Sequence, residues 1–125
     1  MKPPYHSNKA GCSSRRGKIA AMATLLVLTN LPDAEQAHRL ATLLVEQKLA
    51  ACVNILAPCR SVYRWQGKLE DALEVPLLIK TRAERYAELE AAILAHHPYE
   101  LPEIIAVPVE RGLSGYLDWV VEQTS

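Results

Sequence analysis

Two adjacent histidines and two nearby carboxylates form the densest group of potential metal ligands in the sequence. His96 and His97 are neighbours, and Glu100 and Glu103 follow in the same short segment. Imidazole nitrogens suit copper and zinc, and carboxylate oxygens could complete the coordination across a subunit boundary. Neighbouring side chains on a helix diverge by about 100°, so one ion can take at most one of these histidines from a regular helix. The segment indicates either a divalent metal site or histidines that cap a helix and anchor a loop.

Cysteine usage indicates free thiols rather than a disulfide framework or a zinc ribbon. The three cysteines are an odd number, and no two of them form a CxxC pair. Cys52 is a soft candidate ligand for the same metal ion, although its apolar neighbours favour a small buried side chain. Cys59 follows Pro58 in a predicted bend and should be the more exposed thiol. Free thiols are typical of a reducing compartment, so we expect a cytoplasmic protein.

A second kind of site would bind a small anion. Lys80 lies within an apolar segment, and its ammonium group is a ready partner for a phosphate or a carboxylate. Tyr99 and Tyr116 could border the same cleft. The alternative is that Lys80 extends its ammonium group to the sheet edge and that both tyrosines are packing residues. The sequence leaves both interpretations open.

Motifs and charge argue against an enzyme and against a nucleic-acid-binding domain. The chain has no GxSxG elbow, P-loop, dinucleotide fingerprint or HExxH motif. Basic and acidic residues number 14 each, but residues 1–22 contain basic residues and no acid, so the rest of the chain is net acidic. Nucleic-acid binding requires the opposite, a basic face that neutralises phosphates. We therefore expect no catalytic residues and no nucleic-acid partner.

Residues 1–22 differ in composition from the rest of the chain. They are rich in proline, glycine, serine and basic residues and contain little to bury. The basic segment 15–18 and the apolar run 19–28 resemble an export signal. That run is too short to cross a bilayer, however, and cleavage after it would remove a predicted core strand. We expect a flexible extension at 1–22, one folded domain at 23–125, and no membrane partner.

The folded part alternates between strand and helix patterns. Continuous apolar runs and period-2 alternation indicate strands, and apolar residues three and four apart indicate helices. Asp33 can cap the first helix, Ser114 can cap the last, and Gly67 suits a hairpin turn. The predicted strands are 24–29, 51–56 with 61–65, 74–81 and 103–109, and the predicted helices run from Asp33 to about Lys48, from Arg82 to His96 and onward from Ser114.

This order, βαββαβ with a terminal helix, predicts an α+β ferredoxin-like sandwich with both main helices on one face of an antiparallel sheet. The other face would be apolar and uncovered in a monomer, so we expect oligomerisation. Tyr63 and Trp65 alternate near the tip of the long hairpin and suit a subunit interface, where aromatic residues are enriched. The alternative for both is packing on their own domain.

Five separated motifs make the sequence resemble the CutA divalent-cation tolerance family. They occur in order at family-like spacing, and the resemblance covers about residues 23–125. The motifs are Leu49–Ile55, Ser61–Lys68, Glu74–Val75 with Ile79–Thr81, His97–Glu103 and Tyr116–Trp119. The resemblance implies a ferredoxin-like subunit in a homotrimer similar in plan to the PII proteins. It also implies a role in tolerance of divalent metal ions, with copper binding in some members.

Three functional hypotheses follow from these observations. The favoured one is a non-enzymatic homotrimer that binds or responds to divalent metal ions such as copper and requires no cofactor. The others are a PII-like sensor of small anions and a module that anchors an unidentified protein partner. Some family members have a cysteine in the segment that matches Val27–Asn30, and this chain has none there. That difference argues against a copper site that depends on such a thiol.

Overall fold

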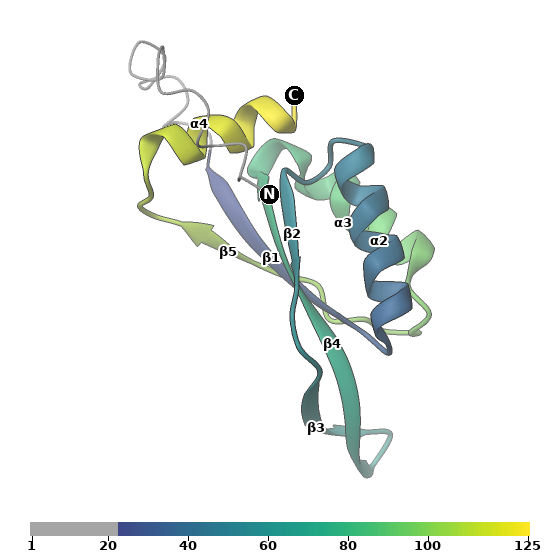
Figure 1. Cartoon of the computed structure of the whole chain (residues 1–125). Coiled ribbons are helices and arrows are strands. Elements are labelled where there is room, and N and C mark those ends of the chain that lie inside the picture. Colours follow the sequence, from purple (N-terminus) through teal and green to yellow (C-terminus); the bar gives the residue numbers. More distant parts are fainter. Residues whose placement is uncertain (1–22) are drawn as a thin grey trace.

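The computed structural model describes residues 23–125, and the predictions for residues 1–22 lie outside that range. The described chain forms an antiparallel sheet with helices packed on it (Figure 1). Its elements are β1 (Thr24–Leu31), α2 (Ala34–Glu46), β2 (Cys52–Ile55), β3 (Cys59–Trp65), β4 (Lys68–Arg82), the 3-10 turn η3 (Ala83–Arg85), α3 (Tyr86–His96), β5 (Ile105–Val109) and α4 (Ser114–Gln123). No helix between residues 23 and 125 has the length and apolar character needed to span a bilayer.

β4 is the central strand of the sheet, whose order is β2-β4-β1-β5. Its segment Val75–Arg82 pairs with β1, and its segment Lys68–Glu74 pairs with β3. The strand therefore runs from the helix-covered body into a hairpin that projects away from it (Figure 1). Gln66 and Gly67 make the tip with φ angles of 50° and 80°, the left-handed backbone that a two-residue hairpin turn requires. This topology is the predicted ferredoxin-like fold, with the second strand split into β2 and β3.

One face of the sheet is buried against α2 and α3. Side chains alternate along β4, so Val75, Leu77 and Ile79 point toward the helices and are almost inaccessible to water. Leu40 and Leu44 of α2 pack in the same core. Full burial of each such side chain contributes about 1.5–3 kcal/mol. The core therefore lies between these helices and the β1–β4 pair.

Asp33 caps α2, as predicted. Its Oδ1 accepts the backbone N–H of Gln36 at 2.8 Å, and its Oδ2 accepts the side-chain amide of the same residue at 2.9 Å. These hydrogen bonds favour the charged carboxylate and lower the pKa of Asp33. The cap fixes the point at which the chain leaves β1 and turns into the helix.

The second main helix begins later than predicted. Arg82 has an extended backbone and is the last residue of β4. Its guanidinium group donates to Oγ1 of Thr124 at 3.0 Å and to the carbonyl oxygen of Thr124 at 2.8 Å, which holds it against α4. The 3-10 turn follows, so α3 starts at Tyr86.

The starts of other elements also differ from the prediction, and the largest difference is in β4, which begins at Lys68 rather than at residue 74. β5 begins at Ile105 rather than at Glu103, because Pro102 lacks a backbone N–H and the loop before the strand follows a different path. Ser114 is the first residue of α4 rather than its cap. Leu113 occupies the cap position with an extended backbone, and no side chain completes the cap.

The opposite face of the sheet is apolar and largely uncovered by the described chain. Leu28 of β1 lies between Leu78 of β4 and Ile105 of β5, and Leu26 pairs with Val107. Ile105 and Val107 are 51% and 49% exposed. α4 packs across one end of the sheet, at Arg82. The apolar face expected from the sequence is therefore present.

Candidate functional site

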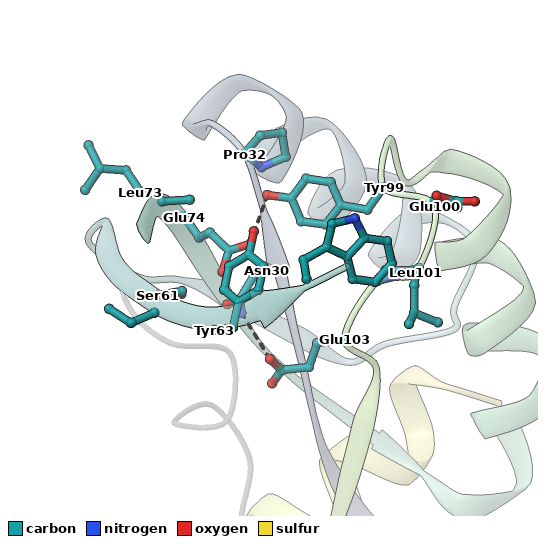
Figure 2. A pocket seen from close by; sticks show the side chains of 14 residues that line it. Asn30, Pro32, Ser61, Tyr63, Leu73, Glu74, Tyr99, Glu100, Leu101 and Glu103 are labelled. Atoms are coloured by element: carbon teal, nitrogen blue, oxygen red, sulfur yellow. Dashed lines mark hydrogen bonds between the residues drawn. The ribbon is translucent and has the colours of Figure 1, made fainter. Parts of the chain in front are cut away.

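A cavity of about 970 Å³ lies between the β3–β4 hairpin and the loop that joins α3 to β5. The hairpin contributes Tyr63, Trp65 and Glu74 to its lining, and the loop contributes Tyr99 and Glu103. Figure 2 shows the Tyr99 ring extending from the loop toward Glu74 on the strand. This volume is typical of sites that hold small molecules. The cavity is therefore the candidate functional site.

Glu74 is the buried carboxylate of the cavity. It is 6% exposed, although glutamate is rarely buried unless it is paired. It sits at the point where β4 changes partner from β3 to β1. The hydroxyl group of Tyr99 donates to Glu74 Oε2 at 2.9 Å, the contact dashed in Figure 2. Within residues 23–125 this is the hydrogen bond that the structure gives to the carboxylate, so Oε1 remains available to a ligand.

Tyr99 is held as a hydrogen-bond donor. Burial raises its pKa most, and the hydrogen bond to Glu74 and the charge of Glu74 raise it further, far above the ordinary value for tyrosine. The phenol therefore keeps its proton at physiological pH. The protonated Tyr99 hydroxyl group holds the Glu74 carboxylate in place, and the charge of that carboxylate in turn keeps the proton on Tyr99.

His97 anchors the loop from inside. Its Nε2 donates to the carbonyl oxygen of Asn30 at 2.7 Å, and its Nδ1 accepts the backbone N–H of Tyr99 at 3.2 Å. The His97 and Tyr99 rings also pack together, with centroids 4.7 Å apart. Burial lowers the pKa of His97 and outweighs the Asn30 carbonyl and the charge of Glu74, which raise it. With both ring nitrogens engaged, His97 could bind a metal only by releasing the loop.

His96 has a different geometry. It is the last residue of α3, its side chain is exposed, and its Nδ1 is 2.9 Å from the carbonyl oxygen of Ala92. Nδ1 is therefore the donor nitrogen, and Nε2 carries the lone pair. Metal-bound histidines usually have their second ring nitrogen bonded in this way. Of the two adjacent histidines, His96 is the one with a nitrogen available for a metal.

The carboxylates expected beside the histidines lie at the rim of the cavity. Glu103 Oε1 accepts a hydrogen bond from Asn30 Nδ2 at 3.2 Å (Figure 2), and Glu100 is exposed. Across residues 23–125, no three His, Cys, Asp or Glu side chains come close enough together to hold a metal ion. A metal centre that uses these residues would therefore need further ligands from another chain.

Cys52 lies apart from the cavity. It is partly buried on β2 and pairs with Lys80 of β4, on the sheet rather than in the loop. Cys59, at the start of β3, is exposed. Neither thiol is joined to His96 or Glu103 in a ligand cluster within the described chain.

The predicted small-ligand cleft is not assembled within one described chain. Lys80 donates to Asn54 Oδ1 on the neighbouring strand. Tyr116 packs against Trp119 on α4, with ring centroids 5.6 Å apart. Tyr99 lines the cavity, whereas Lys80 and Tyr116 do not. The sequence alone does not show which of these three residues come together in space.

Tyr63 and Trp65 form part of the cavity wall. They occupy alternate positions on β3, opposite Glu70 and Lys68 of β4, and remain 43% and 37% exposed. Their own chain therefore covers each ring only in part. Such partly covered aromatic residues are typical of interfaces and of ligand sites.

Sequence reasoning missed Glu74 and Asn30 as members of the site. Glu74 had a visible signal, because it is an acid immediately before alternating apolar strand residues. Asn30 had a weaker one, since an amide at the end of a strand is common in turns. Only the folded loop brings Tyr99 and Glu103 to these two residues.

Comparison with a family model gives a match over nearly all of the described chain. The model for the CutA1 divalent ion tolerance protein matches residues 25–123. That range includes every residue of the cavity and both adjacent histidines.

Individual proteins give the same result. The chain is 48% identical over 91 residues to the divalent-cation tolerance protein CutA of Archaeoglobus fulgidus, covering 73% of this chain and 88% of that protein. It is 44% identical over 99 residues to the CutA protein of Thermus thermophilus, covering 79% and 96%. A solved structure of the Thermus thermophilus protein superposes with a TM-score of 0.80 at 43% identity, covering 82% of this chain and 99% of that one.

Proposed function

Because the chain belongs to the CutA1 divalent ion tolerance family, we propose that it acts as a non-enzymatic homotrimer in cellular tolerance of divalent cations, copper foremost. We place it in the cytoplasm on the basis of its free thiols at Cys52 and Cys59. Its metal sites would form between subunits.

Support for an assembly comes from the uncovered sheet face. Ile105 and Val107 are about half exposed on a face that also carries Leu26, Leu28 and Leu78. Monomeric proteins rarely leave a contiguous apolar surface of this kind in water. A second and third copy of the chain would cover it, and the partly exposed Trp65 would serve as an aromatic anchor.

The observation that carries the metal proposal is the orientation of His96. Its Nδ1–H is held by the Ala92 carbonyl oxygen, so Nε2 carries the lone pair that a metal ion would use, on an exposed helix end. Imidazole is a good ligand for copper and zinc. Glu100 and Glu103 lie on the loop after this helix and could add oxygen ligands, with the remaining positions filled from a neighbouring subunit.

Native mass spectrometry of the full chain, titrated separately with Cu(II) and Zn(II), tests this proposal. We expect a trimer that gains a fixed number of copper ions per subunit. His96→Ala should abolish that uptake, whereas His38→Ala, which removes an exposed histidine from α2, should leave it unchanged. Equal uptake by the wild type and the His96→Ala variant would remove His96 from the site, and a monomer would remove the assembly.

The cavity supports a second candidate function, a trimeric sensor that binds a small ligand and signals to a protein partner. Its volume and aromatic lining suit a small molecule. A small anion has less support, because Glu74, Glu100 and Glu103 line the cavity while Lys80 is bonded to Asn54. The titration distinguishes the two functions, since a sensor would retain its small ligand in the absence of copper.

A further inference from the structure

We propose that the cavity between the β3–β4 hairpin and the α3–β5 loop binds an organic ammonium ion, with Glu74 as its buried counter-ion. This inference is independent of the metal proposal. It rests on the floor and walls of the cavity, whereas the metal proposal rests on His96 at the end of α3. Because the cavity wall includes Trp65, which we also assign to the subunit interface, the ligand would bind at a subunit boundary of the proposed trimer.

The charge of the lining selects a cation. Glu74, Glu100 and Glu103 all line the cavity, and the lining residues include no lysine, arginine or histidine. A concave surface with one sign of charge and low-dielectric walls concentrates ions of the opposite sign. An anion would meet three carboxylates and no positively charged side chain among the described residues that line the cavity.

The walls favour an organic cation over a metal ion. Tyr63, Trp65 and Tyr99 present aromatic rings, and cations are attracted to the faces of such rings. Pro32 and Leu101 supply apolar surface at the same cavity, which suits an aliphatic chain attached to the charged group. Methylated and alkyl ammonium groups are the ligands that aromatic rings with nearby carboxylates recognise best.

Glu74 provides the specific contact. The residue is 6% exposed and lines the cavity, and its Oε2 is already bonded to the hydroxyl group of Tyr99. Its Oε1 has no hydrogen-bond donor among residues 23–125. This oxygen is not among the fully buried polar atoms of the described chain, so a ligand in the cavity could reach it. A primary ammonium group carries three donors and would satisfy it.

A metal ion fits the cavity less well. Calcium takes six to eight oxygen ligands, and magnesium requires a near-octahedral set. Within residues 23–125 no three metal-ligating side chains lie close enough together to hold an ion, and Oε2 of Glu74 already accepts a hydrogen bond from Tyr99. The cavity volume of about 970 Å³ is also far larger than a single ion needs.

Saturation-transfer NMR and calorimetry on the full chain test the proposal with n-butylammonium and tetramethylammonium as probes and n-butanol as the neutral analogue. We expect saturable binding of the ammonium ions and not of the alcohol. Glu74→Gln preserves the shape of the side chain and should weaken n-butylammonium binding by about 10- to 100-fold, the loss expected for one charged hydrogen bond. Glu110→Gln removes the same charge from an exposed site outside the cavity and should leave binding unchanged.

Glu100→Gln provides a second test should the Glu74 variant fold poorly. Glu100 is exposed at the cavity rim, so its loss should weaken binding by only about two- to fivefold with the fold intact. The proposal is overturned if neither ammonium ion binds at millimolar concentration or if n-butanol binds equally well. It is also overturned if the Glu110→Gln variant loses as much affinity as the cavity variants. Competition between Zn(II) and the probes for the Glu74 carboxylate would overturn it as well.

Discussion

The two halves of β4 lie in different environments although they belong to one continuous strand. From Val75 to Arg82 every second side chain is buried against the helices, whereas from Lys68 to Leu73 most side chains are exposed on both faces. The buried half pairs with β1 and carries the apolar core. The exposed half pairs with β3 and carries the cavity wall. Glu74 stands at the junction, so the strand connects a region built for stability to one built for recognition.

The comparison shows how a small domain can contain an open cavity beside its core. The distal half of β4 (Lys68–Leu73) pairs with β3, whose Tyr63 and Trp65 rings remain partly uncovered. Hydrogen bonds from His97 and Tyr99, rather than a second apolar core, position the loop. Burial in the proximal half of β4 (Val75–Arg82) provides the stability on which that loop depends. Substitutions in the two halves should therefore differ in kind as well as in size.

The largest effect is expected for Leu77→Ala in the proximal half. Leu77 is fully buried, so its truncation should lower the free energy of unfolding by about 2–5 kcal/mol. Leu69→Ala, on the same strand but 72% exposed, should change the subunit's unfolding free energy by less than about 0.5 kcal/mol. Urea denaturation measures both. Equal losses in the two variants would contradict the division of the strand.

Trp65→Ala should act on assembly rather than on the subunit fold. Loss of a partly exposed aromatic anchor should weaken subunit association by about 2 kcal/mol or more. Sedimentation equilibrium measures this weakening, with Leu94→Ala on α3 as an exposed control outside the hairpin. An unchanged trimer in the Trp65 variant would place that ring outside the interface.

Tyr99→Phe should destabilise the loop by leaving Glu74 without its donor. The free energy of unfolding, measured by urea denaturation, should fall by about 1–3 kcal/mol, because the carboxylate is buried. Tyr86→Phe is a matched control, since it removes a similar hydroxyl–carboxylate bond to Glu90 on the surface of α3. That variant should lose less than about 1 kcal/mol. A larger loss at Tyr86 would show that burial of Glu74 does not determine the effect.

The smallest effect is a pH dependence that comes from His97. An unfolded histidine takes up a proton near pH 6.5, whereas burial lowers the pKa of His97 in the folded chain. Below that pH the unfolded chain binds more protons, so stability should fall as pH drops from about 6.5 toward the folded pKa and stay level above it.

Urea denaturation on either side of that range, with His97→Gln and with His38→Gln as control, isolates this contribution. The His97 variant should be less stable overall but should lose less on acidification than the wild type. An identical acid loss in the wild type and in the His97 variant would assign the pH dependence to other groups.

Local patterns predicted the features of the molecule that depend on local physics. The Asp33 cap, the Gln66–Gly67 turn and the alternation of Val75, Leu77 and Ile79 all follow from spacing along the chain. Element boundaries were less predictable where a distant contact decides them. Arg82 stays in β4 because of its hydrogen bonds to Thr124, a partner that no local pattern identifies.

The site was predicted only in part, because distant contacts also decide its geometry. The segment that contains His96, His97 and Glu103 was predicted to carry a metal site, and its internal geometry depends on the end of β1. The pairing of Tyr99 with Glu74 joins two segments that neither periodicity nor motif spacing connects. Family resemblance identified both segments without indicating that they meet.

The most direct test of the division within β4 is a backbone amide chemical-shift map of the full chain, titrated with n-butylammonium. We predict that shifts concentrate at Asn30, at residues 61–74 and at residues 99–103, while residues 75–81 of the same strand remain unchanged. Shifts spread evenly along β4, or confined to its helix-covered half, would contradict the assignment of recognition to the distal half.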